Sequence, residues 1–141
     1  MNRDEIVALV KRRESAWQAH DAPALAATHA ERGVAVSPTG GVLEGRAEIE
    51  RVYRLWFTAF PDVRWRMDDI VVDGDRVVVV AQVSGTHAGD FFGVPASGRH
   101  VEVQVAVIMT IADGLVAEER RIYDFTGFLV QVGVLKAKPT A

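Results

Sequence analysis

The sequence IVVDGDRVVVV, residues 70–80, decides the fold of this 141-residue chain. Two runs rich in β-branched residues flank Asp73-Gly74, a dipeptide typical of tight hairpins because glycine tolerates a positive φ. A second such pair, Asp113-Gly114, separates two further runs with a period of two. The pattern therefore predicts long strands that follow one another in an antiparallel meander.

The rest of the second half fits this meander. Alternating apolar residues predict four long strands, at about residues 63–72, 76–87, 101–111 and 115–123. A loop with three glycines and a proline lies between His87 and Arg99. The segment 125–134 has a helix-like pattern, with Gly133 as a plausible C-cap.

The first half is helical. Apolar residues recur every three or four positions over residues 4–19 and again over 49–60, where Pro61 ends the run. Asp21 can cap a short helix over 22–29, and a brief strand at 34–37 follows it.

This order of elements, helices first and a meander afterwards, is typical of the α+β class. We expect one domain over residues 1–135, in which a cone-like, curved antiparallel sheet packs against three helices of the N-terminal half. Residues 136–141 read as a loose tail.

Composition narrows the function. The chain has no cysteine, which excludes disulfides and thiolate chemistry and fits a cytoplasmic location. The N-terminus does not read as a signal peptide, and no apolar run is long enough to span a membrane. A net charge of −3 with scattered Lys and Arg argues against nucleic acid as a partner.

Motifs for hydrolytic triads, phosphate loops and dinucleotide binding are absent from the sequence. The four histidines lack metal-binding spacing, so we expect neither a metal nor a cofactor. His87 with Asp90 could form a ligand pair, but two polar loop residues are the simpler interpretation.

Aromatic residues are concentrated on the helix 49–60. Tyr53, Trp56 and Phe60 share one face there, and Trp17 lies on the apolar face of the first helix. Such a stripe forms either packed core or the wall of a pocket for an apolar ring. We expect a cavity of roughly a few hundred cubic ångströms beside Tyr53 and Trp56, with Phe91 or Phe92 at its entrance.

Asp124 follows the last strand and precedes apolar residues. A carboxylate that faces an apolar cavity has a raised pKa, which suits a general acid or base. The same residue could instead cap the helix that starts after it. Arg120 could hold an oxyanion, but the turn at Asp113-Gly114 leaves open which sheet face Arg120, Gln104 and Val107 occupy.

Two motifs carry a family resemblance. The loop GTHAGDFFGVPASGR, residues 85–99, and the segment DFTGFLVQVG, residues 124–133, resemble the SnoaL-like polyketide cyclases, also called ester cyclases. The likeness runs from about residue 13 to 135. It implies the fold of nuclear transport factor 2, a cystatin-like roll, and a cofactor-free acid/base role for Asp124 in aldol ring closure. The family's Glu-His-Trp strand is replaced here by Glu118-Glu119-Arg120.

The leading hypothesis is thus a lyase or isomerase of the cyclase type that acts on a small hydrophobic carbonyl compound. Asp124 would be its acid/base, and Arg120 or His87 would hold the enolate oxygen. The expected ligand-binding residues are Trp17, Tyr53, Trp56, Phe60, His87, Phe91, Phe92 and Arg120.

Two alternatives remain open. The pocket could bind its ligand without turnover, or Asp124, Arg120 and Glu102 could form an epoxide hydrolase site, in which two carboxylates bracket an arginine. We also expect a homodimer packed through the uncovered sheet face.

Overall fold

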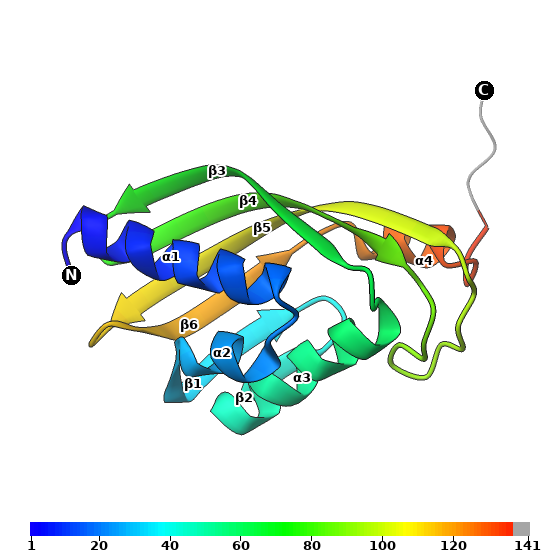
Figure 1. Cartoon of the computed structure of the whole chain (residues 1–141), viewed down its shortest axis with the longest axis horizontal. Coiled ribbons are helices and arrows are strands. Elements are labelled where there is room, and N and C mark those ends of the chain that lie inside the picture. Colours follow the sequence, from blue (N-terminus) through cyan, green and yellow to red (C-terminus); the bar gives the residue numbers. More distant parts are fainter. Residues whose placement is uncertain (137–141) are drawn as a thin grey trace.

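A computed structural model describes residues 1–136 of the chain, so the expected tail lies outside the described residues except for Lys136. Its elements are α1 (Arg3–Gln18), α2 (Ala22–Ala27), β1 (His29–Ser37), β2 (Gly41–Glu44), α3 (Arg46–Ala59), β3 (Arg64–Asp73), β4 (Arg76–Thr86), β5 (His100–Ala112), β6 (Leu115–Ile122) and α4 (Phe125–Gln131). The α+β class is confirmed, because α1, α2 and α3 cover one face of a curved sheet (Figure 1).

The sheet has six strands in the order β2-β1-β6-β5-β4-β3. Strands β3 to β6 form the predicted antiparallel meander. The expectation of a wholly antiparallel sheet is wrong at one place, since β1 pairs with β6 in parallel. No hairpin turn links these two strands, so turn chemistry does not set their relative direction.

The two hairpins use glycine differently. Asp113 and Gly114 form the β5–β6 turn, and their φ angles of 52° and 76° are the pair of positive values that a type I′ turn needs. In the β3–β4 hairpin Asp73 pairs with Arg76, so the loop consists of Gly74 and Asp75. A φ of 60° at Gly74, the first loop position, suits a type II′ turn.

A β-bulge in β6 decides which side chains face the helices. Thr110 pairs with Glu118 and Ile111 pairs with Val116, which leaves Ala117 as an extra residue. Because side chains alternate between faces, the extra residue turns Glu119 inward, whereas an unbulged strand with Val116 inward would turn Glu118 inward.

Helices α1, α2 and α4 begin at side-chain caps, whereas Gly45 gives α3 none. Asp21 accepts a hydrogen bond from the amide of Ala24 at 3.0 Å, which confirms its predicted role at the start of α2. Asn2 and Glu5 form a reciprocal capping box at the start of α1. The inner face of α1 is apolar apart from Arg13, which is buried.

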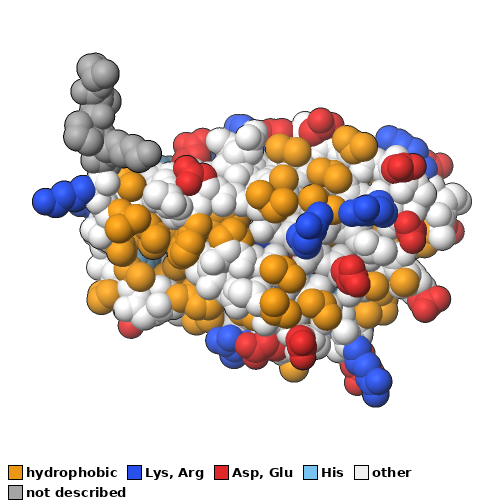
Figure 2. Space-filling model, turned by 180° about the vertical axis from the view of Figure 1, so that it is seen from behind, with side chains coloured by type: hydrophobic (Ala, Val, Ile, Leu, Met, Phe, Trp, Pro, Cys, Tyr) orange, Lys and Arg blue, Asp and Glu red, His pale blue; other side chains and the backbone are white. Residues whose placement is uncertain are grey.

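The outer face of the sheet is turned to the viewer in Figure 2, where apolar side chains lie among charged ones. One row of paired residues crosses all six strands there, and five of its six members are apolar: Val71, Val78, Ile108, Arg120, Val36 and Val42. Within residues 1–136, no helix is both long and apolar enough to cross a membrane.

Candidate functional site

A cavity lies between the inner face of the sheet and helices α1 and α3. The cavity volume is about 50 Å³, less than the few hundred expected, because large side chains fill much of the space. Trp17 and Trp65 stack within it with ring centroids 4.8 Å apart. The rest of its wall is mostly apolar and includes Val79, Val83, Val103, Val105, Val107 and Met109.

Three charged side chains in the cavity wall form what we call the charged cluster: Arg13, Glu119 and Arg121. Arg13 donates through Nη2 to Oε1 of Glu119 at 2.6 Å. Arg121 donates to the other oxygen, Oε2, through Nε at 3.0 Å and Nη2 at 2.8 Å. One buried carboxylate is therefore held between two guanidinium groups.

Three neutral groups hold Arg13 in place. Its Nη1 donates to Thr28 Oγ1 at 2.6 Å and lies 3.1 Å from Nε2 of His29, and its Nη2 donates to the Tyr53 hydroxyl at 3.2 Å. Arginine can only donate, so Nε2 of His29 is an acceptor and the ring proton is on Nδ1. The Tyr53 hydroxyl, 2.8 Å from Nε2, therefore donates to it.

The electrostatics of the cluster follow from burial and pairing. Burial alone would raise the pKa of Glu119, but Arg121 and Arg13 outweigh it and lower the pKa to about 2. Burial lowers the pKa of His29 to about 3, so its ring is neutral near pH 7. Arg121 also lies over the Tyr53 ring, 4.8 Å from its centroid. Two cations and one anion face each other here.

Three of the expected ligand-binding residues do line the cavity: Trp17, Tyr53 and Trp56. Phe60 and Phe91 do not. They pack with Trp56 and Phe128 in what we call the aromatic cluster, with ring centroids 4.6–6.0 Å apart. This cluster is core, so of the two residues expected at the entrance, Phe91 or Phe92, Phe91 is instead buried in it.

The glycine-rich loop 87–99 closes the end of α3. The amides of Ala88 and Gly89 both donate to the carbonyl of Ala59. At Gly89 a Cβ would lie only 2.6 Å from the Thr58 carbonyl oxygen, so this close approach requires glycine. The motif therefore docks the loop against the helix.

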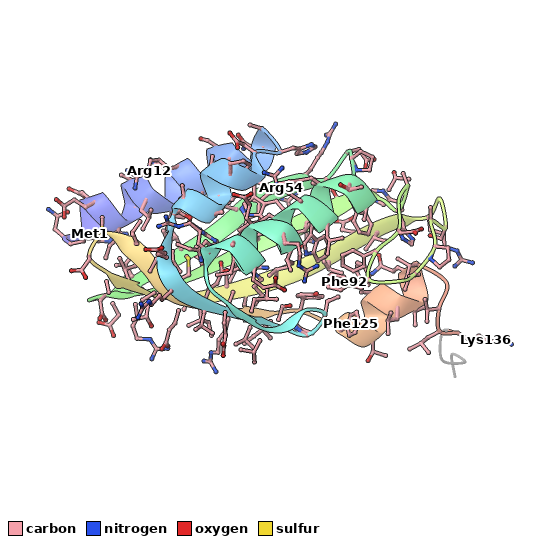
Figure 3. The ribbon with its side chains drawn as sticks, turned by 90° about the horizontal axis from the view of Figure 1, so that it is seen from below. Met1, Arg12, Arg54, Phe92, Phe125 and Lys136 are labelled. Carbon is pink, nitrogen blue, oxygen red and sulfur yellow. The ribbon has the colours of Figure 1, made fainter. Side chains whose placement is uncertain are left out.

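The other two predicted loop residues also lie outside the cavity wall. His87 is buried, stacks on Phe60 with centroids 5.5 Å apart and holds Ser97 through Nδ1 at 2.8 Å. Phe92 is 38% exposed, on the loop at the α4 end of the molecule (Figure 3). Neither residue lines this cavity.

Asp124 is exposed, and its side chain accepts a hydrogen bond from the amide of Gly127 at 2.9 Å, as the N-cap of α4. The expectation that its carboxylate points into the cavity is wrong. The strand ends before Asp124, and four unpaired amides of the new helix turn offer it donors. The catalytic role predicted from the sequence lacks the geometry that it needs.

Arg120 is also exposed, because the bulge at Ala117 turns it to the outer face opposite Ile108. Glu102 lies on that face too, where it pairs with Gln82. The alternative epoxide hydrolase site of Asp124, Arg120 and Glu102 therefore does not form. The cavity instead holds the opposite arrangement, one carboxylate between two arginines.

Sequence reasoning missed the charged cluster. A signal for Arg13 was present, since it falls in the apolar series Ile6, Leu9, Val10 and Trp17 of the first helix. A signal for Glu119 and Arg121 was hidden, because a bulge cannot be located from alternation alone. In the described part of the chain, no group of three or more His, Asp or Glu side chains is placed to share a metal ion.

Comparison with known proteins agrees with this fold. The family model of the SnoaL-like polyketide cyclases matches residues 7–132. The chain belongs to this family. No match was found among curated proteins.

Several solved structures have folds similar to that of this chain. A protein of Jannaschia sp. CCS1, provisionally named a SnoaL-like polyketide cyclase, has 25% identity and a TM-score of 0.85 over 96% of this chain and 99% of its own. AclR of Streptomyces galilaeus, provisionally named a hydroxylase, has 26% identity and a TM-score of 0.84 over 98% and 87%. A nuclear transport factor 2-like protein of Burkholderia pseudomallei, of unknown function, shares the fold at 18% identity, with a TM-score of 0.79 over 94% and 99%.

Proposed function

We propose that this SnoaL-like protein is a cofactor-independent acid/base catalyst of the cyclase type, acting on a small hydrophobic carbonyl compound. The observation that carries the proposal is a buried guanidinium, Arg121, in an otherwise largely apolar cavity. A donor fixed in a water-poor site stabilises the negative charge that develops on a carbonyl oxygen as an enolate forms.

The proton acceptor must be a carboxylate other than Glu119. Held by two arginines and with a pKa of about 2, Glu119 is a weak base. Glu14 also lines the cavity, is half-buried and makes no hydrogen bond or ion pair with the described residues. We assign the role of base to Glu14.

The proposed reaction moves one proton. Glu14 takes the proton from the carbon next to the carbonyl, and the electron pair of the C–H bond moves to the carbonyl oxygen beside Arg121. The enolate carbon then attacks a second carbonyl carbon of the same substrate and forms the new C–C bond. The resulting alkoxide takes the proton back from Glu14, so the sum is an isomeric ring.

Proton exchange tests this proposal without knowledge of the natural substrate. We expect the protein to speed deuterium incorporation into the acidic carbon of phenylacetone in D₂O, followed by NMR. Glu14→Gln should lower the rate by about 10²–10⁴-fold while ligand binding persists. The matched control is Asp124→Asn, which changes a carboxylate outside the cavity. Equal rates for wild type and Glu14→Gln would contradict the assignment.

One observation favours a binding protein as the second candidate. Glu119 of the charged cluster and the neighbouring His29 have pKa values well below their ordinary ones, at about 2 and 3. Groups tuned in this way hold a fixed charge pattern, which suits recognition better than proton transfer. A ligand that binds in the cavity, with no exchange above the buffer rate for any aryl ketone, would support this candidate.

The homodimer remains a proposal. The apolar row on the outer sheet face, centred on Ile108, is the surface that a second copy would cover. Light scattering should show a dimer for the wild type and a monomer for Ile108→Lys. Thr110→Lys, on the same strand and face but outside the row, is the control and should stay dimeric.

A further inference from the structure

The charged cluster is not electrically balanced. Arg13 and Arg121 carry two positive charges, Glu119 carries one negative charge, and the buried ring of His29 is neutral. Arg46 adds a cation at the same end, because it donates to the carbonyl of His29 through Nε at 3.0 Å and Nη2 at 2.7 Å. The buried end of the cavity therefore has an excess of positive charge.

We propose that the cavity selects ligands bearing an anionic oxygen on a flat apolar ring, and that Arg121 binds this oxygen. This rests on the proposed function only in placing the ligand in the same cavity. The chemical class is a ring with a carboxylate, or with an ionised enol or phenol.

The cost of burying a charge gives the physical reason. A guanidinium without a counter-charge is unfavourable in a water-poor site, and an anionic ligand removes this cost. Glu14 is the remaining charged residue among those that line the cavity. It is half-exposed, so water screens its charge more than that of the buried cluster.

Arg121 has a donor to spare. Its Nε and Nη2 bind Glu119, and Nη1 has no hydrogen-bond partner among the described residues. The Arg121 side chain is 10% exposed and lines the cavity. The Tyr53 ring below the guanidinium fixes its plane, which prepares it for a hydrogen bond to an anion.

The walls select the rest of the ligand. Valines from β4 and β5 cover one side of the cavity, and the aromatic rings of Trp17, Trp56 and Trp65 cover others. These surfaces pack well against an apolar ring and offer few hydrogen-bond partners to a polar chain. The small free volume favours one ring over a fused system.

Three probes that differ mainly in charge test the proposal: benzoate, acetophenone and benzylammonium. Binding to the whole protein at pH 7.5 is measured by ligand-observed NMR and by quenching of tryptophan fluorescence. We expect benzoate to bind about ten- to a hundredfold more tightly than acetophenone, as a charged hydrogen bond in place of a neutral one predicts. Benzylammonium should bind more weakly than acetophenone.

Arg121→Gln supplies the second test. This variant leaves Arg13 and Glu119 as a balanced pair, so the fold should survive, and the ratio of benzoate to acetophenone affinity should fall to about one. Arg120→Gln is the matched control, because it removes the neighbouring positive charge from the outer face. It should keep the wild-type ratio.

Three results would overturn the inference: equal affinities for benzoate and acetophenone, a ratio that Arg121→Gln leaves unchanged, or no binding by any probe. If Arg121→Gln does not fold, the wild-type affinities alone decide. The readout is an affinity ratio, so it is independent of turnover. Selectivity for benzoate without deuterium exchange would refute the proposed catalysis and leave the inference standing.

Discussion

The two ends of the space under the sheet differ in their side chains, which are charged at one end and aromatic at the other. At one end, the charged cluster joins α1 to β6 across 106 residues of sequence, with every short contact made through hydrogen bonds. At the other, the aromatic cluster joins α3, the loop 87–99 and α4 by ring packing, and the amides of Ala88 and Gly89 add hydrogen bonds to the carbonyl of Ala59. Both ends are buried, yet polar specificity is confined to the first.

The motifs that carry the family resemblance and the charged residues of the cavity lie at different ends of the molecule. The two motifs that identify the family, in residues 85–99 and 124–133, contribute Phe91 and Phe128 to the aromatic cluster and a cap to α4. They preserve the architecture of one end. The charged residues of the cavity wall, Arg13, Glu119 and Arg121, lie at the other end, and Glu119 stands where the related strand has a histidine.

The largest effect should come from removing the carboxylate of the charged cluster. Glu119→Gln leaves two buried guanidinium groups without a counter-charge, and we expect the free energy of unfolding to fall by about 5 kcal/mol. Urea denaturation at pH 7.5 measures it. Glu118→Gln, its exposed neighbour, should change the value by less than about 0.5 kcal/mol. Equal values for the two variants would mean that the cluster does not stabilise the fold.

A substitution in the aromatic cluster should lower the stability of the fold without changing the selectivity for benzoate over acetophenone. Phe128 is 1% exposed, so Phe128→Ala leaves a cavity and should cost about 3–4 kcal/mol. The ratio of benzoate to acetophenone affinity should stay at its wild-type value, because the charges lie at the other end. A changed ratio in a folded Phe128→Ala protein would show that the two ends are coupled.

Low pH should lower the free energy of unfolding through the buried groups at the charged end. The unfolded chain protonates His29 below its ordinary pKa of 6.5, whereas the folded chain does so only near 3. The neutral His29 ring therefore contributes fully to the free energy of unfolding above pH 6.5, and this contribution is lost progressively as pH falls towards 3. At pH 4.5 the loss is about 3 kcal/mol. Glu119, with a pKa of about 2 against 4.5, adds a loss between those values.

Urea denaturation at pH 7.5 and pH 4.5 measures this loss. His29→Gln keeps an acceptor for Arg13 and should reduce the difference between the two pH values by about 3 kcal/mol. His100→Gln, at an exposed histidine, should leave the difference unchanged. A wild-type difference that His29→Gln does not reduce would contradict the neutral state of the buried ring.

The smallest effect concerns Asp124. As an N-cap, Asp124→Ala should lower the free energy of unfolding by about 1 kcal/mol, and Asp124→Asn should lower it by much less. Deuterium exchange should be the same in all three proteins. A rate that falls in Asp124→Asn at unchanged stability would restore the catalytic role predicted from the sequence.

Much of the fold was predictable because its signals are local. Two Asp-Gly pairs, the change of period after Phe60 and the aromatic face of α3 gave the class and nearly every element. The strand β2 and the parallel pairing of β1 were missed, since a four-residue strand carries little pattern and no turn joins β1 to β6. Trp17, Tyr53 and Trp56 were found in the wall because large aromatic residues are buried wherever the helix faces the sheet.

By itself, the sequence determined the family, the meander, the Asp21 cap of α2 and the burial of an aromatic face, because the signals for these features are local. Only the tertiary structure decided which polar side chains share the cavity. A single extra residue, Ala117, turns Glu119 and Arg121 inward and Arg120 outward. The packing of α1 then brings Arg13 within 2.6 Å of Glu119. Strand register and helix docking are set by long-range packing, which no local pattern encodes.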